Sequence, residues 1–244
     1  TLYRNIFDHI SSVAGRYSGK IKGWDVVNEA ILDDGSYREN DFYKISADEY
    51  IFKSFEIAHK IDPNAELYYN DFSMYKPEKC DAAIRIANKI LERGLRIDGI
   101  GLQAHWGLDY PSIGEIETSI LKIHEAGFRV HFTELDIDVL PNLWEIEGAD
   151  LSDNFKSNDQ LTPYKSSLPD SISDLLSDRY TEIFELFDKH NDKIDRVTFW
   201  GLSDGHSWKN DWPAKGRTNY PLLFDRENNP KKAYKDIMML FNEK

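Results

Sequence analysis

Residues 21–30 read IKGWDVVNEA, and this stretch indicates the fold class. A short apolar run, rich in β-branched residues, ends abruptly in the polar pair Asn28 and Glu29. Comparable runs predict further strands, so that the five expected strands cover 21–28, 66–70, 99–103, 129–134 and 195–201. Because these runs are mostly continuous and do not alternate with polar residues, they are typical of strands that are covered on both faces.

The segments between these strands show the periodicity of amphipathic helices. Apolar residues spaced three or four apart predict helices over 2–16, 47–61, 77–93, 112–126, 171–190 and 230–242. Strand followed by helix, repeated, indicates parallel βα units in an α/β barrel or a doubly wound sheet. No glycine-rich phosphate-binding motif follows any strand, which counts against a nucleotide fold. One polar connection, 139–170, is unusually long, and such loops are commonly functional or mobile.

Composition narrows the classes of partner. The chain has 244 residues, with 30 Lys and Arg against 43 Asp and Glu, a formal charge of −13. This acid excess argues against nucleic acid or an anionic membrane surface as the main partner. Cys80 is the single cysteine, so no internal disulfide is expected. No apolar run reaches the roughly 18–20 residues of a membrane span, and no signal peptide opens the chain.

Polar and aromatic side chains gather where the expected strands end. They are Asn28 and Glu29, Asn70 and Asp71, Gln103 and His105, Glu134 and Asp136, and Trp200 with Trp208 beyond it. The carboxyl ends of the strands of a parallel barrel share one face, and active sites lie on that face. The pattern therefore predicts an active site built from several strand ends.

Two of these residues, Glu29 and Glu134, suit glycoside hydrolysis. That reaction needs one carboxyl to protonate the leaving oxygen and a second, ionised one to attack or to activate water. A single glutamate at a strand end is more often a salt-bridge partner, but two on different strands favour catalysis. His105 could link Asp136 to Glu134, which would orient Glu134 and tune its charge.

The tryptophans divide into two kinds. Trp24 lies within an expected strand and is assigned to the core, whereas Trp106, Trp200, Trp208 and Trp212 follow strand ends. Flat indole rings beside polar groups suit a sugar, which has apolar faces and polar edges; for Trp106 and Trp212 a packed loop core is the alternative. No zinc motif or Cys/His cluster is present, so we expect neither a metal nor a cofactor.

Five ordered motifs resemble glycoside hydrolase family 10 endo-β-1,4-xylanases. They are WDVVNEA at 24–30, LYYNDF at 67–72, GIGLQAHW at 99–106, HFTELDI at 131–137 and VTFWGLSDGHSW at 197–208. The resemblance implies a (β/α)₈ barrel that hydrolyses xylan or xylo-oligosaccharides with retention. It implies that Glu29 is the general acid/base and Glu134 the nucleophile.

The same resemblance implies the roles of the neighbouring residues. Asn28 would bind the 2-hydroxyl of the sugar at the cleavage position, and Asn70 would line the cleft near Glu29. Gln103 and His105 would lie beside Glu134, with Asp136 behind His105. Trp200 and Trp208 would cradle the same sugar. The family commonly has Tyr where this chain has Phe72, so the hydroxyl that Tyr would supply on the leaving-group side is missing.

The family places its WDVVNE motif on the fourth strand, so this chain is expected to supply strands four to eight. Residues 1–244 would then be the C-terminal part of one catalytic barrel, without a second domain. We expect the first three strands from an N-terminal segment, either a separate chain or one removed by cleavage. In some family members a carbohydrate-binding domain is inserted after the third strand, at the helix where this chain begins, and we expect such an insertion between the N-terminal segment and this chain.

Two other functions stay open at this point. A retaining β-glucanase or mannanase would place carboxylates after the same two strands, and a non-catalytic xylan-binding fragment would use the same surface. Since a polymeric substrate cannot enter a cell, a secreted, periplasmic or cell-surface location is expected.

Overall fold

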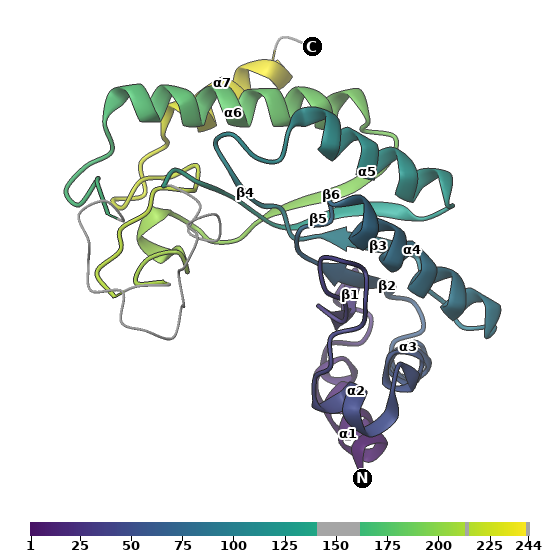
Figure 1. Cartoon of the computed structure of the whole chain (residues 1–244). Coiled ribbons are helices and arrows are strands. Elements are labelled where there is room, and N and C mark those ends of the chain that lie inside the picture. Colours follow the sequence, from purple (N-terminus) through teal and green to yellow (C-terminus); the bar gives the residue numbers. More distant parts are fainter. Residues whose placement is uncertain (141–161, 213–214, 243–244) are drawn as a thin grey trace. The chain divides into compact units, whose positions relative to one another are not determined.

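The computed structural model describes residues 1–140, 162–212 and 215–242 (Figure 1). These residues form two compact units. Unit 1 comprises Thr1–Gln103, Glu115–Thr133 and Asp192–Arg196, and unit 2 comprises Ala104–Gly114, Glu134–Asn191 and Val197–Lys244. Most of the long connection expected over 139–170 lies outside the described residues.

Unit 1 is built on parallel strands. Strands β1 (Gly23–Asn28), β2 (Glu66–Asp71), β3 (Gly99–Leu102) and the first part of β5 (Arg129–Asp138) pair in that order, all parallel. The register places Asn28 opposite Asn70, and Asn70 opposite Gly101. Parallel pairing thus brings the polar ends of β1 and β2 side by side.

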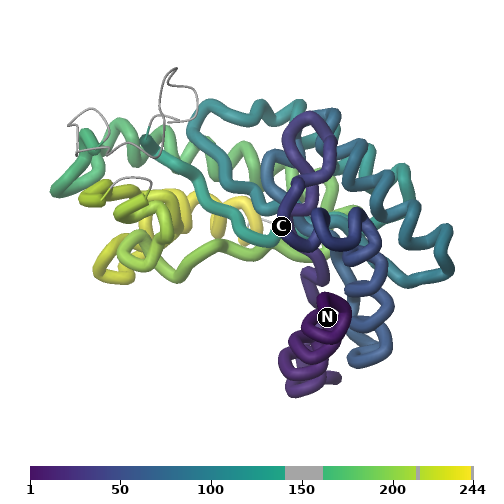
Figure 2. Tube along the Cα trace, turned by 60° about the horizontal axis from the view of Figure 1, so that its bottom comes forward, coloured from purple at the N-terminus to yellow at the C-terminus, as the bar shows by residue number. Residues whose placement is uncertain are grey.

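Five helices accompany these strands: α1 (Leu2–Val13), α2 (Asp41–Ser46), α3 (Glu49–Ile61), α4 (Pro77–Glu92) and α5 (Ile113–Glu125), with a short 3-10 turn at Gly15–Tyr17 after α1. Helices α1 and α3 lie side by side in both views (Figures 1 and 2), and α4 packs against β3. Their apolar faces close a core whose fully buried members include Ile51, Phe55, Leu67, Ile86, Ile100, Ile120 and Phe132.

Unit 2 contains β4 (His105–Gly107), the second part of β5, the second half of β6 (Ile194–Phe199), the 3-10 turn Asp204–His206, α6 (Asp170–Lys189) and α7 (Lys232–Asn242). Strand β4 pairs in parallel with β5, and the register sets His105 opposite Asp136. Helix α7 packs along α6 (Figure 1). The buried side chains Trp106, Leu176, Tyr180, Ile183, Leu222 and Ile237 form its core.

All six expected helices and all five expected strands are present, with their ends shifted by at most four residues. Two short elements were not expected, α2 and β4. Strand β5 also runs to Asp138, four residues past its expected end, because its second part pairs with β4. Parallel strands alternating with helices fit the (β/α)₈ barrel class. No helix among the described residues is long and apolar enough to cross a membrane.

Candidate active site

Glu29 follows the last residue of β1 in a rare backbone conformation. Its φ is +58°, in the left-handed region, which costs a residue with a side chain about 1–3 kcal/mol. Neighbouring groups hold this conformation: the N–H of Glu29 donates to the Asn70 carbonyl at 2.9 Å, and its carbonyl accepts from Nε of Arg38 at 2.9 Å. The chain therefore turns sharply at Glu29, and the partly exposed side chain is fixed at the strand end.

The Glu29 cluster consists of Asn28, Glu29, Asn70 and Gln103, all in unit 1. Nε2 of Gln103 donates to Oε1 of Glu29 at 3.0 Å and to Oδ1 of Asn28 at 3.1 Å. The Asn28 side-chain amide also points to Glu29, at 3.4 Å, and Nδ2 of Asn70 donates to Oδ1 of Asn28 at 3.0 Å. Three neutral amides thus orient one carboxyl group, with no cation among these contacts.

Asn70 is held by residues that the sequence did not single out. Its Oδ1 accepts from the Thr133 hydroxyl at 2.8 Å, and its side chain occupies the space above Gly101. A Cβ at Gly101 would lie 2.5 Å from Asn70 Oδ1, closer than any van der Waals contact allows. The Asn70 side chain therefore requires a glycine at position 101. The sequence signal for this requirement is a glycine that lies opposite an asparagine in the adjacent parallel strand.

The Glu134 cluster consists of His105, Glu134, Asp136 and Trp208, all in unit 2. Nε2 of His105 lies 3.2 Å from Oε2 of Glu134, and Nδ1 lies 2.9 Å from Oδ1 of Asp136. The chain of contacts from Asp136 through His105 to Glu134 that the sequence suggested is therefore present. Glu134 and His105 are largely buried, with side chains 12% and 16% exposed.

Asp136 is fully buried and satisfied by several donors. Besides His105 it accepts from Nε1 of Trp208 at 2.8 Å, and Nζ of Lys209 stands 3.5 Å away. Burial alone would lower the pKa of His105, but the hydrogen bonds to Asp136 and then to Glu134 outweigh it and raise that pKa. Lys209 is a supporting residue that the sequence reasoning missed, although it directly follows Trp208.

The indole rings take different positions. Trp208 stands edge-on to His105 with ring centroids 5.1 Å apart, and its ring lies 4.8 Å from that of Trp212. Trp200 follows β6, is 46% exposed, and its backbone N–H donates to the carbonyl of Leu135, next to Glu134. Trp106 is buried against Phe187, so the packed-loop alternative applies to it. Trp24 is partly exposed and donates to Asp62.

The family model for glycosyl hydrolase family 10 matches residues 1–240. The chain belongs to glycosyl hydrolase family 10. It is 45% identical to endo-1,4-beta-xylanase A of Xylanibacter ruminicola, over 98% of this chain and 65% of that protein. It is 38% identical to the endo-1,4-beta-xylanase of Geobacillus stearothermophilus, over 96% and 66%. The chain thus spans slightly less than two thirds of the length of these curated relatives.

Solved structures of the family agree with this membership. A GH10 endoxylanase retrieved from a sugarcane soil metagenome superposes with a TM-score of 0.91 at 44% identity, covering 98% of this chain and 68% of that one. Xylanase XynB of Paenibacillus barcinonensis gives 0.85 at 33% identity, covering 96% and 67%.

The resemblance implied a place for Gln103 beside Glu134, and within unit 1 its amide contacts Glu29 and Asn28. Phe72, where the family commonly has tyrosine, has a different contact: Nζ of Lys79 lies 3.5 Å from the centre of its ring.

Among the described residues, no three His, Cys, Asp or Glu side chains gather as ligands for a metal ion.

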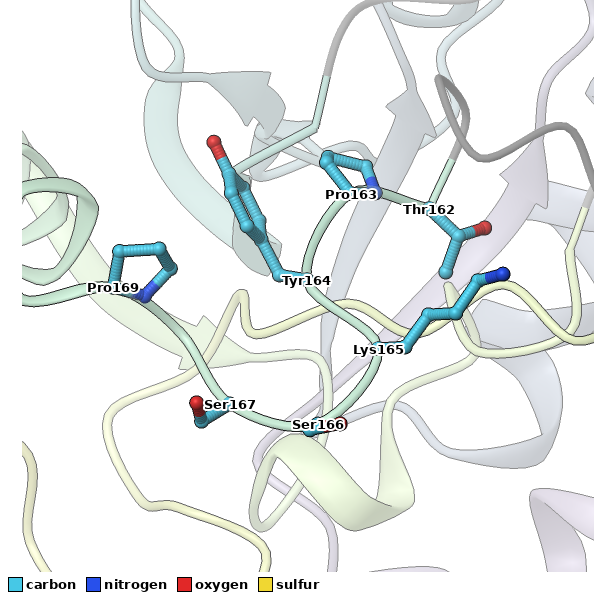
Figure 3. A pocket seen from close by; sticks show the side chains of 7 residues that line it. All are labelled: Thr162, Pro163, Tyr164, Lys165, Ser166, Ser167 and Pro169. Atoms are coloured by element: carbon cyan, nitrogen blue, oxygen red, sulfur yellow. The ribbon is translucent and has the colours of Figure 1, made fainter.

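A surface hollow of about 350 Å³ lies elsewhere in unit 2 (Figure 3). Its lining is Thr162, Pro163, Tyr164, Lys165, Ser166, Ser167 and Pro169. None of these residues carries a carboxyl group, so the hollow offers no proton donor of the kind that glycoside hydrolysis needs. Neither the Glu29 cluster nor the Glu134 cluster contributes to this lining.

Proposed function

We propose that this protein is a retaining endo-β-1,4-xylanase in which Glu29 and Glu134 act on the same glycosidic bond. The observation that carries the proposal is the contrast between the two carboxyl groups. Glu134 faces a histidine that is itself held by the buried Asp136, whereas the hydrogen bonds to the Glu29 carboxyl within the described part of the chain come from the neutral amides of Gln103 and Asn28. Two carboxyls in different surroundings suit the two different roles that retaining hydrolysis requires.

In the proposed reaction, a carboxylate oxygen of Glu134 attacks the anomeric carbon while the bond to the leaving oxygen breaks. Glu29 gives its proton to that oxygen, which departs as a hydroxyl. Glu29, now ionised, takes a proton from water, and the water oxygen replaces Glu134 at the anomeric carbon. Because a raised pKa favours the protonated imidazole, His105 would stabilise Glu134 as a carboxylate before attack and on its release.

Sugar binding is assigned to residues around these two carboxyls. Asn28 is proposed to bind the 2-hydroxyl of the attacked sugar, with Asn70, Gln103 and His105 as further polar contacts. Trp200 and Trp208, both more than a third exposed, would supply apolar faces for the sugar rings. Asp136 has a supporting role through His105.

Variants of the two carboxyls test the proposal. In the complete protein, Glu134→Ala and Glu29→Ala should each lose most activity on xylan, by about 100-fold or more. Azide should restore turnover of an activated aryl xylobioside by Glu29→Ala, because it attacks the glycosyl-enzyme without needing a base. Retention of parent rates by either variant would contradict the assignment.

The stereochemistry and the substrate are tested separately. NMR of the first product should show the β-anomer, as expected for retaining enzymes, whose carboxyl groups stand about 5–5.5 Å apart. Reducing-sugar release should be greatest on xylan when xylan, glucan and mannan are compared. Greater release from glucan or mannan would favour the related activity, and xylan binding without hydrolysis would favour a binding fragment.

We also propose that the chain supplies the later five βα units of a (β/α)₈ barrel and that an N-terminal segment supplies the first three. The curated relatives are about half as long again as this chain. Among the described residues, β1 pairs only with β2, and its exposed edge would find a partner in a preceding strand. We also propose a secreted, periplasmic or cell-surface location, because a polymeric substrate cannot enter a cell.

A further inference from the structure

Behind Glu29 lies a buried group of polar residues that the proposed reaction does not use. Tyr69, Asp71 and Lys79, here called the Tyr69 network, all belong to unit 1. Their side chains are almost completely inaccessible, at 0% relative exposure for each residue. Lysine and aspartate are very seldom buried to this degree unless they are paired, so the burial of these two charged side chains needs a structural explanation.

The network begins at the backbone that follows Glu29. The N–H of Ala30 donates to the Tyr69 hydroxyl at 3.1 Å, and this hydroxyl donates to Oδ2 of Asp71 at 2.5 Å. The single hydroxyl hydrogen is thereby committed to the carboxylate, and a lone pair remains for Ala30. An ionised Asp71 therefore sets the direction of the hydrogen bond that fixes the Glu29–Ala30 peptide.

The Lys79 ammonium group favours the ionised form of Asp71. Its Nζ lies 3.0 Å from Oδ1 of Asp71 and 3.2 Å from Oδ1 of Asp33, and the Phe72 ring covers it. Burial raises the pKa of Asp71, while the Lys79 charge and the hydrogen bond from Tyr69 oppose that rise. The cation comes from α4, a separate element from the strand that carries Tyr69 and Asp71.

We propose that Tyr69, supported by Asp71 and Lys79, is a positioning residue for the acid/base Glu29. Its hydroxyl holds the Ala30 N–H and so helps to keep Glu29 in the left-handed conformation that aims its carboxyl group. This inference rests on the proposed function, since it assigns the network to the proton-transfer role of Glu29. Neither Tyr69 nor Asp71 is proposed to touch the sugar.

The test uses two substrates that differ only in their need for a proton. Phenyl β-xylobioside has a poor leaving group and requires acid catalysis, whereas 2,4-dinitrophenyl β-xylobioside leaves readily without it. In the complete protein, Tyr69→Phe should lower kcat/KM for the phenyl substrate on the order of tenfold. It should leave kcat/KM for the dinitrophenyl substrate close to the parent value, because that parameter reports the first chemical step.

Tyr68→Phe is the matched control. Tyr68 is the preceding residue on β2, is equally buried, and its hydroxyl donates to Glu66 at 3.0 Å, away from Glu29. Removing this hydroxyl should leave the ratio of the two kcat/KM values unchanged. An equal loss on both substrates in Tyr69→Phe, or the same change in ratio in Tyr68→Phe, would overturn the proposal.

Asp71→Asn provides a second variant that keeps the side-chain shape but removes the charge. It should change the ratio of the two kcat/KM values in the same direction as Tyr69→Phe, with folding checked by thermal melting. Loss of folded protein in both variants would assign the network to stability alone and overturn the proposal.

Glu29→Ala in the same assay separates the two hypotheses. Glu29→Ala should lower kcat/KM, which reports the first chemical step, far more for the phenyl substrate than for the dinitrophenyl substrate. If it does not, the acid role of Glu29 fails. If it does while Tyr69→Phe shows no preference, only the positioning role of Tyr69 fails.

Discussion

Gly101 shows how one missing side chain shapes the site. Because a Cβ there would stand 2.5 Å from Asn70 Oδ1, Gly101→Ala should displace the Asn70 amide and, through it, Asn28. We expect a loss of about 1–3 kcal/mol in the free energy of unfolding and reduced activity, measured by denaturant titration and xylan hydrolysis. Gly114→Ala is the control, since a Cβ there meets nothing within 4 Å. Equal stability of the two variants would contradict this account.

His131 makes stability depend on pH. Burial, followed by the charge of Arg196, lowers its pKa from 6.5 to about 4, and its ring accepts a hydrogen bond from Nε of Arg196 at 2.7 Å. Between pH 6.5 and 4 the unfolded chain binds a proton that the folded chain does not, so the free energy of unfolding falls as pH falls through this range.

The corresponding measurement is denaturant unfolding at pH 7, 5 and 4. His131→Gln should lose less stability between pH 7 and pH 4 than the parent protein loses. His9→Gln, at an exposed position on α1, should follow the parent. A steeper loss in His131→Gln than in the parent would contradict the proposed cause.

The sequence identified Glu29, Glu134, His105 and Asp136 as site residues, because polar residues that directly follow an apolar strand are conspicuous. Lys79 was not located. Taken by itself a lysine indicates a solvated surface, yet Lys79 lies three, four and seven residues before Ala82, Ala83 and Ile86 on the buried face of α4. The helical spacing contains that signal, but the carboxylates that make burial tolerable come from other segments of the chain.

Among the elements, β4 does most to arrange the Glu134 cluster. Its three residues pair with the second part of β5 and set His105 opposite Asp136. A three-residue strand is too short to show a periodicity, and α2, at six residues, is close to that limit. The extension of β5 to Asp138 was also missed, because its hydrogen-bonding partner is β4 itself.

The pairing of β4 with β5, which sets His105 opposite Asp136, predicts that Asp136 controls the pKa of His105. The hydrogen bond that His105 donates to Asp136 raises the pKa of His105, so Asp136→Asn should lower that pKa, as measured by NMR titration of the ring protons. Removing the buried charge should also reduce the free energy of unfolding by about 1–3 kcal/mol.

Asp138→Asn is the matched control for this effect. It removes the same charge two residues along β5, where Asp138 contacts Lys209, Arg217 and Asn219 rather than His105. The pKa of His105 should not change in this variant. An equal fall in both variants would indicate a general field effect and not the hydrogen bond.

At the scale of the whole molecule, the proposed N-terminal segment should determine whether the protein is monomeric and whether it hydrolyses xylan. The described strand β1 has an exposed edge, and exposed apolar side chains on α1 include Tyr3, Phe7 and Val13. We expect residues 1–244 expressed alone to aggregate and to lack xylan hydrolysis, whereas the protein with three preceding βα units should be monomeric and active. Size-exclusion chromatography and reducing-sugar assays check this, and a monomeric, fully active 1–244 would contradict it.

By itself, the sequence determined the succession of parallel βα units and the residue types at each strand end. Both depend on local patterns, namely apolar periodicity and the change from apolar to polar. The tertiary structure decided which side chains meet: Gln103 with Glu29, Thr133 with Asn70, and Lys79 with Asp71. These pairs are 8 to 74 residues apart, and strand register, helix packing and burial bring them together, none of which a local pattern specifies.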